Sequence, residues 1–76
     1  MSEDEIDRIA QRLYTDYSPE SRGESPNVTE AACQYLAKLM VENERGGQKE
    51  IAEEYDCTVA SLQNRKNQIV EELQLQ

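Results

Sequence analysis

The spacing of its apolar residues constrains this chain most strongly. They recur every three or four positions along nearly the whole length, which is the period of an α-helix with one buried side. In the first segment this spacing places a set of apolar side chains on one face, namely Ile6, Ile9, Ala10, Leu13 and Tyr17. No segment shows the alternation of a half-buried strand. The sequence therefore predicts an all-α fold without strands.

Breaks rich in Gly, Pro and Ser divide the chain into four predicted helices. The composition of SPESRGES predicts a loop, and a Gly-Gly pair further on accepts the left-handed backbone that ends a helix. Pro26 starts the second helix, where its missing N–H costs nothing, and Ser25 precedes it as the cap. We expect a single helical domain over 1–76, with a first helix at 2–17, a loop at 18–25, a second helix at 26–45 and a helix-turn-helix at 48–73.

The predicted core is thin. The chain has 76 residues with four Tyr and neither Phe nor Trp, and a domain of this size buries only about 60% of its unfolded surface. In the second helix the apolar set expected to face inward is Val28, Ala32, Tyr35, Leu36, Leu39 and Met40. A core of this size is open to completion by a second copy, a partner or high salt.

The chain is strongly acidic. Asp and Glu number 16 against 8 Lys and Arg, for a net charge of -8, and such a chain repels nucleic-acid phosphates at long range. Disordered acidic tails have similar composition, but the helical periodicity is too regular for one. A salt-rich, halophilic cytoplasm is the interpretation we favour, because about 1 M salt screens the repulsion to within about 3 Å.

Composition also argues against catalysis and metal binding. The chain has no His and only two Cys, Cys33 and Cys57, and two thiolates do not complete a tetrahedral zinc site. Both cysteines occupy inward positions, as free thiols often do, and a disulfide between them is the alternative. Neither a nucleophile paired with a base nor a cleft with paired carboxylates is indicated. We expect no enzyme activity, no catalytic residues, no metal and no cofactor.

We expect no signal peptide at the start of the sequence. The start, MSEDEIDRIA, is acidic and lacks the apolar core of a signal peptide. No stretch approaches the roughly 20 apolar residues of a membrane span. We expect a soluble, cytoplasmic protein without a membrane partner.

The segment EIAEEYDC has the residue pattern of the first half of a helix-turn-helix. Such a motif needs an apolar residue followed by a small one where the second helix crosses, and Ile51 and Ala52 supply them. Four residues later the turn requires positive φ, which Asp tolerates after Gly, and Asp56 occupies this position. Cys57 then supplies the apolar residue tucked under the turn.

The second half follows directly. Thr58 is a good N-cap for the next helix, and Leu62 falls where that helix must bury an aliphatic residue. Such corners also occur in helical bundles that never touch DNA, so a purely structural role stays open. The charge distribution favours a nucleic-acid partner, because residues 57–70 contain no carboxylate and carry +2 of the net -8, which leaves -10 on the remainder.

The outer face of the last helix suits base recognition. Asn and Gln pair bidentately with adenine, Arg with guanine or a phosphate, and a helix N-terminus can hold a phosphate. Asn64 lies near the centre of this face and Arg65 toward its edge. The candidate DNA-binding residues are Thr58, Ala60, Ser61, Gln63, Asn64, Arg65, Asn67 and Gln68.

These segments resemble the second cyclin-like repeat of archaeal transcription initiation factor B, over roughly residues 4 to 73. The densest match lies between residues 48 and 65. The matching residues are Ser25-Pro26, Ala31-Ala32, Tyr35-Leu36-Ala37, Gln48, Glu50-Ile51-Ala52-Glu53, Thr58 and Asn64-Arg65.

The resemblance implies a cyclin-like helical fold whose last two helices read promoter DNA, beside other initiation proteins. This chain departs from the family at Ala60 and Gln63, which stand where the family has base-contacting Val and Arg, and at Asp56 and Lys66. The zinc ribbon, the first repeat and the first helix of the second repeat are missing from the sequence.

Two hypotheses follow. The first is a small helix-turn-helix protein that binds DNA in a salt-dependent manner and regulates transcription. The alternative is an adaptor that keeps the fold but binds protein, either transcription initiation proteins or a second copy of itself as a homodimer. The net charge of -8 motivates the alternative.

Overall fold

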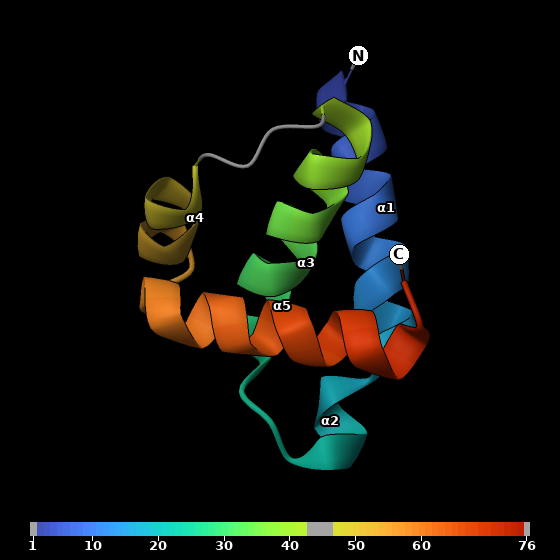
Figure 1. The fold of residues 1–76 in the computed structure, drawn as a ribbon, viewed down its shortest axis with the longest axis vertical. Helices are drawn as coiled ribbons and strands as arrows, with labels where there is room; N and C mark the ends of the chain where they lie inside the picture. Colours follow the sequence, from blue (N-terminus) through green and yellow to red (C-terminus); the bar gives the residue numbers. More distant parts are fainter. Residues whose placement is uncertain (1, 43–46, 76) are drawn as a thin grey trace.

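The computed structural model describes residues 2–42 and 47–75 of the chain. Within these residues it contains five helices and no strand, and the predicted all-α fold is confirmed. The helices are α1 (Ser2–Tyr17), α2 (Pro19–Arg22), α3 (Pro26–Glu42), α4 (Gln48–Glu54) and α5 (Val59–Leu73) (Figure 1).

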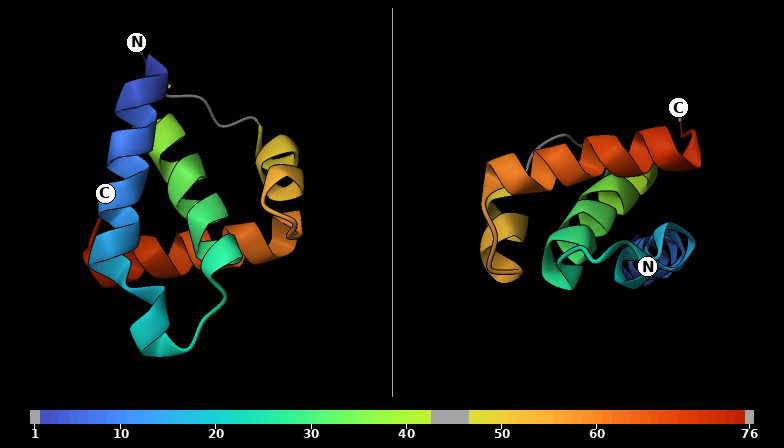
Figure 2. Two further views of the ribbon diagram at one scale, coloured as in Figure 1. Left: turned by 180° about the vertical axis from the view of Figure 1, so that it is seen from behind. Right: turned by 90° about the horizontal axis from the view of Figure 1, so that it is seen from below.

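Helix α3 is the centre of the molecule and contacts each of the other four helices. Helices α1 and α3 run side by side, and α4 stands on the other side of α3 (Figure 1). Helix α5 crosses these three helices as a separate layer (Figure 2). One long side of α5 therefore faces away from the rest of the protein.

Small side chains allow α3 to be surrounded in this way. Ala31, Ala32 and Ala37 are fully buried, and Cys33 is 1% exposed. Where side chains are this small, neighbouring helices approach closely and pack at the density of a protein interior. The run of Ala and Cys in α3 thus accounts for its central position.

Two clusters of buried residues form the core, and α5 contributes to both. Leu62 belongs to the cluster between α3, α4 and α5, and Ile69 to the cluster between α1, α3 and α5. The two residues are two helical turns apart on the same face of α5, and neither is exposed to solvent. These two side chains hold α5 across the layer beneath it.

The predicted loop at 18–25 contains the short helix α2, which corrects the sequence-based expectation. Ser18 adopts a φ of 55°, which ends α1, and Pro19 then starts a new helix with its fixed φ. Gly23, at a φ of 69°, ends that turn. Ser18-Pro19 and Gly23 thus mark the two ends of one helical turn, and the segment is not a continuous loop.

The other boundaries agree closely with the prediction. The second helix begins at Pro26 as expected and is described up to Glu42. The predicted remainder, 43–45, lies outside the described residues, as does Gly46. The helix-turn-helix segment begins at Gln48 and ends at Leu73.

The inward set predicted for α3 is partly wrong. Met40 is 48% exposed, and Val28 and Leu39 are only half-buried. The middle of α3 is covered on several sides by its neighbours, so Ala31 and Cys33 are buried there. A single-stripe pattern assumes one packed face, and a helix with several neighbours does not obey it.

No helix in the described part of the chain combines the length and the apolar content that crossing a bilayer requires.

Candidate functional site

The turn between α4 and α5 has the backbone geometry that the sequence predicts. Asp56 adopts a φ of 59°, and the N–H of Cys57 donates to the carbonyl of Ala52 over 2.8 Å. The amide of Asn27, at the start of α3, donates to the carbonyls of Tyr55 (3.0 Å) and Asp56 (3.3 Å). The sequence analysis missed Asn27, because its contact joins residues 28 and 29 positions apart.

The start of α5 is capped and anchored as expected. The hydroxyl of Thr58 accepts from the N–H of Ser61 over 3.1 Å, which satisfies one of the free donors at the helix N-terminus. Leu62 packs in one buried cluster with Ile51 and Ala52 of α4. This packing sets the angle between α4 and α5.

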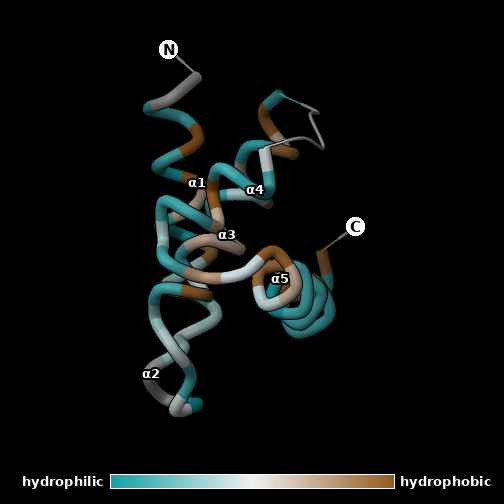
Figure 3. Tube along the Cα trace, turned by 90° about the vertical axis from the view of Figure 1, so that its left-hand side faces the viewer, coloured by the Kyte–Doolittle hydropathy of each residue, from teal (hydrophilic) through white to brown (hydrophobic). Residues whose placement is uncertain are grey.

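Most of the candidate residues lie together on the outward side of α5. Figure 3 shows α5 end-on, to one side of the other helices, with hydrophilic residues along its outer surface. Ser61 is half-buried beside the cap. The exposed members are Thr58, Ala60, Gln63, Asn64, Asn67 and Gln68.

The amide of Gln63 is tied to α4. Its Nε2 donates to Oε1 of Gln48 over 2.6 Å, and the Nε2 of Gln48 donates to the hydroxyl of Tyr35 over 2.9 Å. This chain of hydrogen bonds runs from the surface of α5 to the buried ring of Tyr35. It restrains the side chain of Gln63. Among the candidate amides of α5, Asn64 and Asn67 are those for which the structure gives no hydrogen bond to the described residues.

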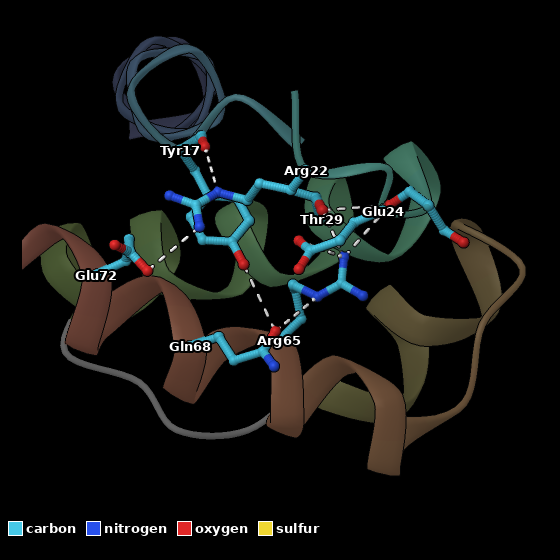
Figure 4. Close-up of polar contacts among 8 residues, drawn as sticks. Tyr17, Arg22, Glu24, Thr29, Arg65, Gln68 and Glu72 are labelled. Atoms are coloured by element: carbon cyan, nitrogen blue, oxygen red, sulfur yellow. Dashed lines mark hydrogen bonds and ion pairs between the residues drawn. The ribbon is translucent and has the colours of Figure 1, made fainter. Parts of the chain in front are cut away.

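Arg65 turns toward the protein. Its Nη1 donates to the hydroxyl of Thr29 over 2.8 Å and lies 3.5 Å from the carbonyl of Ser25. The same nitrogen is 3.5 Å from Oε1 of Glu24, and the Arg65 side chain is only 17% exposed (Figure 4). The sequence places Arg65 at the edge of the outward face, whereas the structure directs its charge inward.

The carboxylate that pairs with Arg65 is partly buried. Glu24 Oε1 is buried and accepts no hydrogen bond from the described residues. Burying a carboxylate oxygen is costly unless its charge is compensated, and the ion pair with Arg65 supplies that compensation. Releasing Arg65 would remove the cation that pairs with this carboxylate.

Tyr17 extends the same network to α1 and α2. Its hydroxyl donates to Oε1 of Gln68 at 3.5 Å, an atom that also accepts from Nε of Arg65 at 3.1 Å. The guanidinium of Arg22 lies 4.3 Å from the Tyr17 ring centroid and bonds the surface carboxylate of Glu72. Burial, together with the neighbouring carboxylate of Glu24, raises the pKa of Tyr17. The network (Figure 4) fastens the middle of α5 to the rest of the molecule.

The outward face of α5 is consequently neutral. Arg65 is paired internally, and Lys66 is half-buried at the edge of the apolar stripe. Carboxylates flank the face, with Glu71 exposed further along α5 and three exposed acids on α4, namely Glu50, Glu53 and Glu54. Hydrogen bonding, and not charge attraction, is the chemistry that this face offers.

Both cysteines are free thiols, so the alternative of a disulfide is not realised. Burial raises the pKa of Cys33 to about 12, with a smaller contribution from Glu30. Burial, and then the charge of Asp56, raises the pKa of Cys57. In the portion of the chain that the structure describes, no three His, Cys, Asp or Glu side chains are grouped to hold a metal ion.

Comparison with protein-family models, with curated proteins and with solved structures finds no match to this chain. We therefore classify the chain from its own structure. It is an all-α protein in which α4 and α5 form a two-helix corner, and one side of α5 faces solvent.

Proposed function

We propose that this protein binds duplex DNA through the outward face of α5 and regulates transcription. The observation that carries the proposal is the composition of that face, which is exposed, rich in amides and free of carboxylates from 57 to 70. Asn64 and Asn67 lie one turn apart on it, and side-chain amides make bidentate hydrogen bonds to adenine in the major groove. The resemblance to an initiation-factor repeat supports DNA as the partner, whereas Ala60 and Gln63 replace the family's base-contacting residues, so the promoter element of the family is not carried over.

The charge of the outward face of α5 predicts how the affinity for DNA depends on salt. A protein that binds phosphates through Lys and Arg loses affinity as salt rises, but here Arg65 is paired with Glu24 and the net charge is -8. Salt mainly screens the repulsion between the acidic protein and DNA, as the Debye length falls from about 10 Å at 0.1 M to about 3 Å at 1 M. We expect the affinity for DNA to stay level or to rise over this range.

Fluorescence anisotropy with labelled duplexes, A·T-rich and G·C-rich, at 0.1 M and 1 M KCl tests the proposal. Asn64→Asp should weaken binding about tenfold or more, because it places a carboxylate against the DNA and removes a base contact worth about 1–3 kcal/mol. Gln11→Glu is the matched control, since it adds the same charge to an exposed position on α1. Equal losses in the two variants, or no binding at tens of micromolar protein, would refute DNA binding by α5.

One observation favours a second function, that of a protein-binding adaptor. The acidic outer side of α4 stands beside α5 and opposes phosphate contacts there, and the guanidinium of Arg65 is engaged within the protein. Light scattering and a pull-down with Asn64→Glu and Asn67→Glu variants, both at exposed positions of α5, distinguish the two functions. A stable complex that survives both changes supports the adaptor.

A further inference from the structure

A surface groove lies between α1, α3 and the end of α4, above the seam between the two core clusters. Its volume is about 380 Å³. Ala10 and Cys33, from the cluster of α1 and α3, form part of its lining. Tyr14 packs against that cluster and Tyr55 against the other, so an aromatic side chain belongs to each side of the seam. Its described lining residues include none from α5.

Negative charge converges on this groove. Asp7 and Glu30 line it and are exposed, and neither forms an ion pair among the described residues. Asp7 accepts one hydrogen bond, from Nε2 of Gln34 over 3.2 Å, which leaves its charge uncompensated. Burial raises the pKa of Tyr55, and the charges of Glu54, Glu30 and Asp7 raise it further, so these carboxylates lie within electrostatic reach of its phenol.

The lining defines the chemistry of a ligand. A nucleic acid or another anion is repelled by Asp7 and Glu30. A Lys or Arg side chain is complementary to this lining. Its aliphatic stem covers the apolar residues, and its cation interacts with the carboxylates and the aromatic rings. Arg suits the groove better than Lys, since its planar guanidinium both stacks on aromatic rings and pairs with carboxylates.

We propose that this groove is a docking site for an arginine-bearing basic segment of a partner protein, with Asp7 and Glu30 binding the cation and Tyr14 and Tyr55 flanking it. The site stands apart from DNA binding by α5, because it uses different helices. The protein then has two faces of different chemistry, a neutral amide face on α5 and an acidic aromatic groove formed chiefly by α1 and α3.

A fluorescein-labelled peptide with several arginines tests the groove, by anisotropy at 0.15 M NaCl with the full chain. Glu30→Gln should weaken binding about fivefold, which corresponds to about 1 kcal/mol, the upper end of the range for an exposed charge pair. Tyr55→Leu should weaken it about threefold, through loss of an aromatic face worth about 0.5–1 kcal/mol. Glu71→Gln is the matched control, since it removes the same charge from an exposed site on α5 and should leave the affinity within about 1.5-fold.

Equal weakening by Glu30→Gln and Glu71→Gln would overturn the proposal, because the peptide would then respond only to overall charge. Absence of binding at millimolar peptide would overturn it as well. Amide shift changes that cluster around Tyr14, Glu30 and Tyr55 would support it independently of the variants. The DNA titration with Asn64→Asp reports on the other face, so each proposal can fail without the other.

Discussion

Arg65 of α5 donates a hydrogen bond to the hydroxyl of Thr29 of α3 over 2.8 Å. Thr29 is completely buried, and its hydroxyl in turn donates to the carbonyl of Ser25 over 3.2 Å. A basic side chain from the face expected to meet DNA thus completes the hydrogen bonding of a buried hydroxyl. This contact makes Arg65 a structural residue of the α3–α5 interface.

Replacing Thr29 by Val should destabilise the protein by about 1–2 kcal/mol, because the change keeps the shape but removes the shortest hydrogen bond of the Arg65 guanidinium. The free energy of unfolding in urea measures the effect. Thr15→Val is the matched control at an exposed position of α1, where the hydroxyl donates to the carbonyl of Gln11. It should change stability by no more than about 0.5 kcal/mol, and a similar loss in both variants would contradict the structural role of Thr29.

Leu62→Ala should cost about 2–5 kcal/mol, because Leu62 is completely buried and the change opens a cavity between α4 and α5. In a domain of this size that loss removes much of the total stability. Leu62→Met, which conserves volume, should cost less than about 1.5 kcal/mol. Met40→Ala, at the exposed end of α3, serves as the control and should be nearly neutral. A neutral Leu62→Ala variant would show that the corner is not packed as described.

Substitutions at Asp56 should follow the backbone requirement of the turn. At a φ of 59° Gly has no steric penalty, whereas a β-branched residue such as Val is destabilised by about 1–2 kcal/mol. Asp56→Gly should therefore be neutral or slightly stabilising, and Asp56→Val clearly destabilising, in thermal unfolding followed by circular dichroism. The reverse order would be incompatible with a left-handed residue at this position.

The Cys33 thiol should make stability fall at alkaline pH. Burial raises its pKa in the folded protein to about 12, whereas an unfolded thiol ionises near 8.5. Between these values the unfolded chain binds fewer protons, so the free energy of unfolding decreases as pH rises, by at most about 1.4 kcal/mol per pH unit. Urea unfolding between pH 8 and 10 should show this slope, and Cys33→Ala should reduce it.

The control for that experiment is Cys57→Ala. Burial also raises the pKa of Cys57, but this side chain is only half-buried, so its removal should change the slope less. Tyr17 and Tyr55 have raised pKa values as well and contribute mainly above their ordinary value of about 10. A slope unaffected by Cys33→Ala would show that the thiol is accessible to water.

Local features of the fold were predictable from the sequence. The positive φ of Asp56, the cap at Thr58 and the packing of Leu62 on Ile51 and Ala52 all follow from residue types at fixed short spacings. Each depends on backbone sterics or on hydrogen bonds within a few residues. The exposure of Asn64 and Asn67 follows from the helical period in the same way.

Contacts between distant segments were not predictable. Asn27 stabilises a turn 28 positions away, and the acceptor for Arg65 lies 36 positions back along the chain. Helix periodicity also fails to predict that Met40 is exposed, because exposure near the end of α3 depends on how far the neighbouring helices cover it. The groove lined by Tyr14 and Tyr55 likewise exists only once α1, α3 and α4 are assembled.

The sequence by itself determined the helical class, the corner between α4 and α5 and the amide-rich composition of one side of α5. These properties are local, since they depend on the helical repeat and on the conformational preferences of single residues. Only the tertiary structure decided that Arg65 points inward, because Glu24 and Thr29 offer its guanidinium partners from other segments. For this reason the outward face of α5 is neutral. The sequence of α5 alone does not reveal this, because the partners of Arg65 belong to other segments.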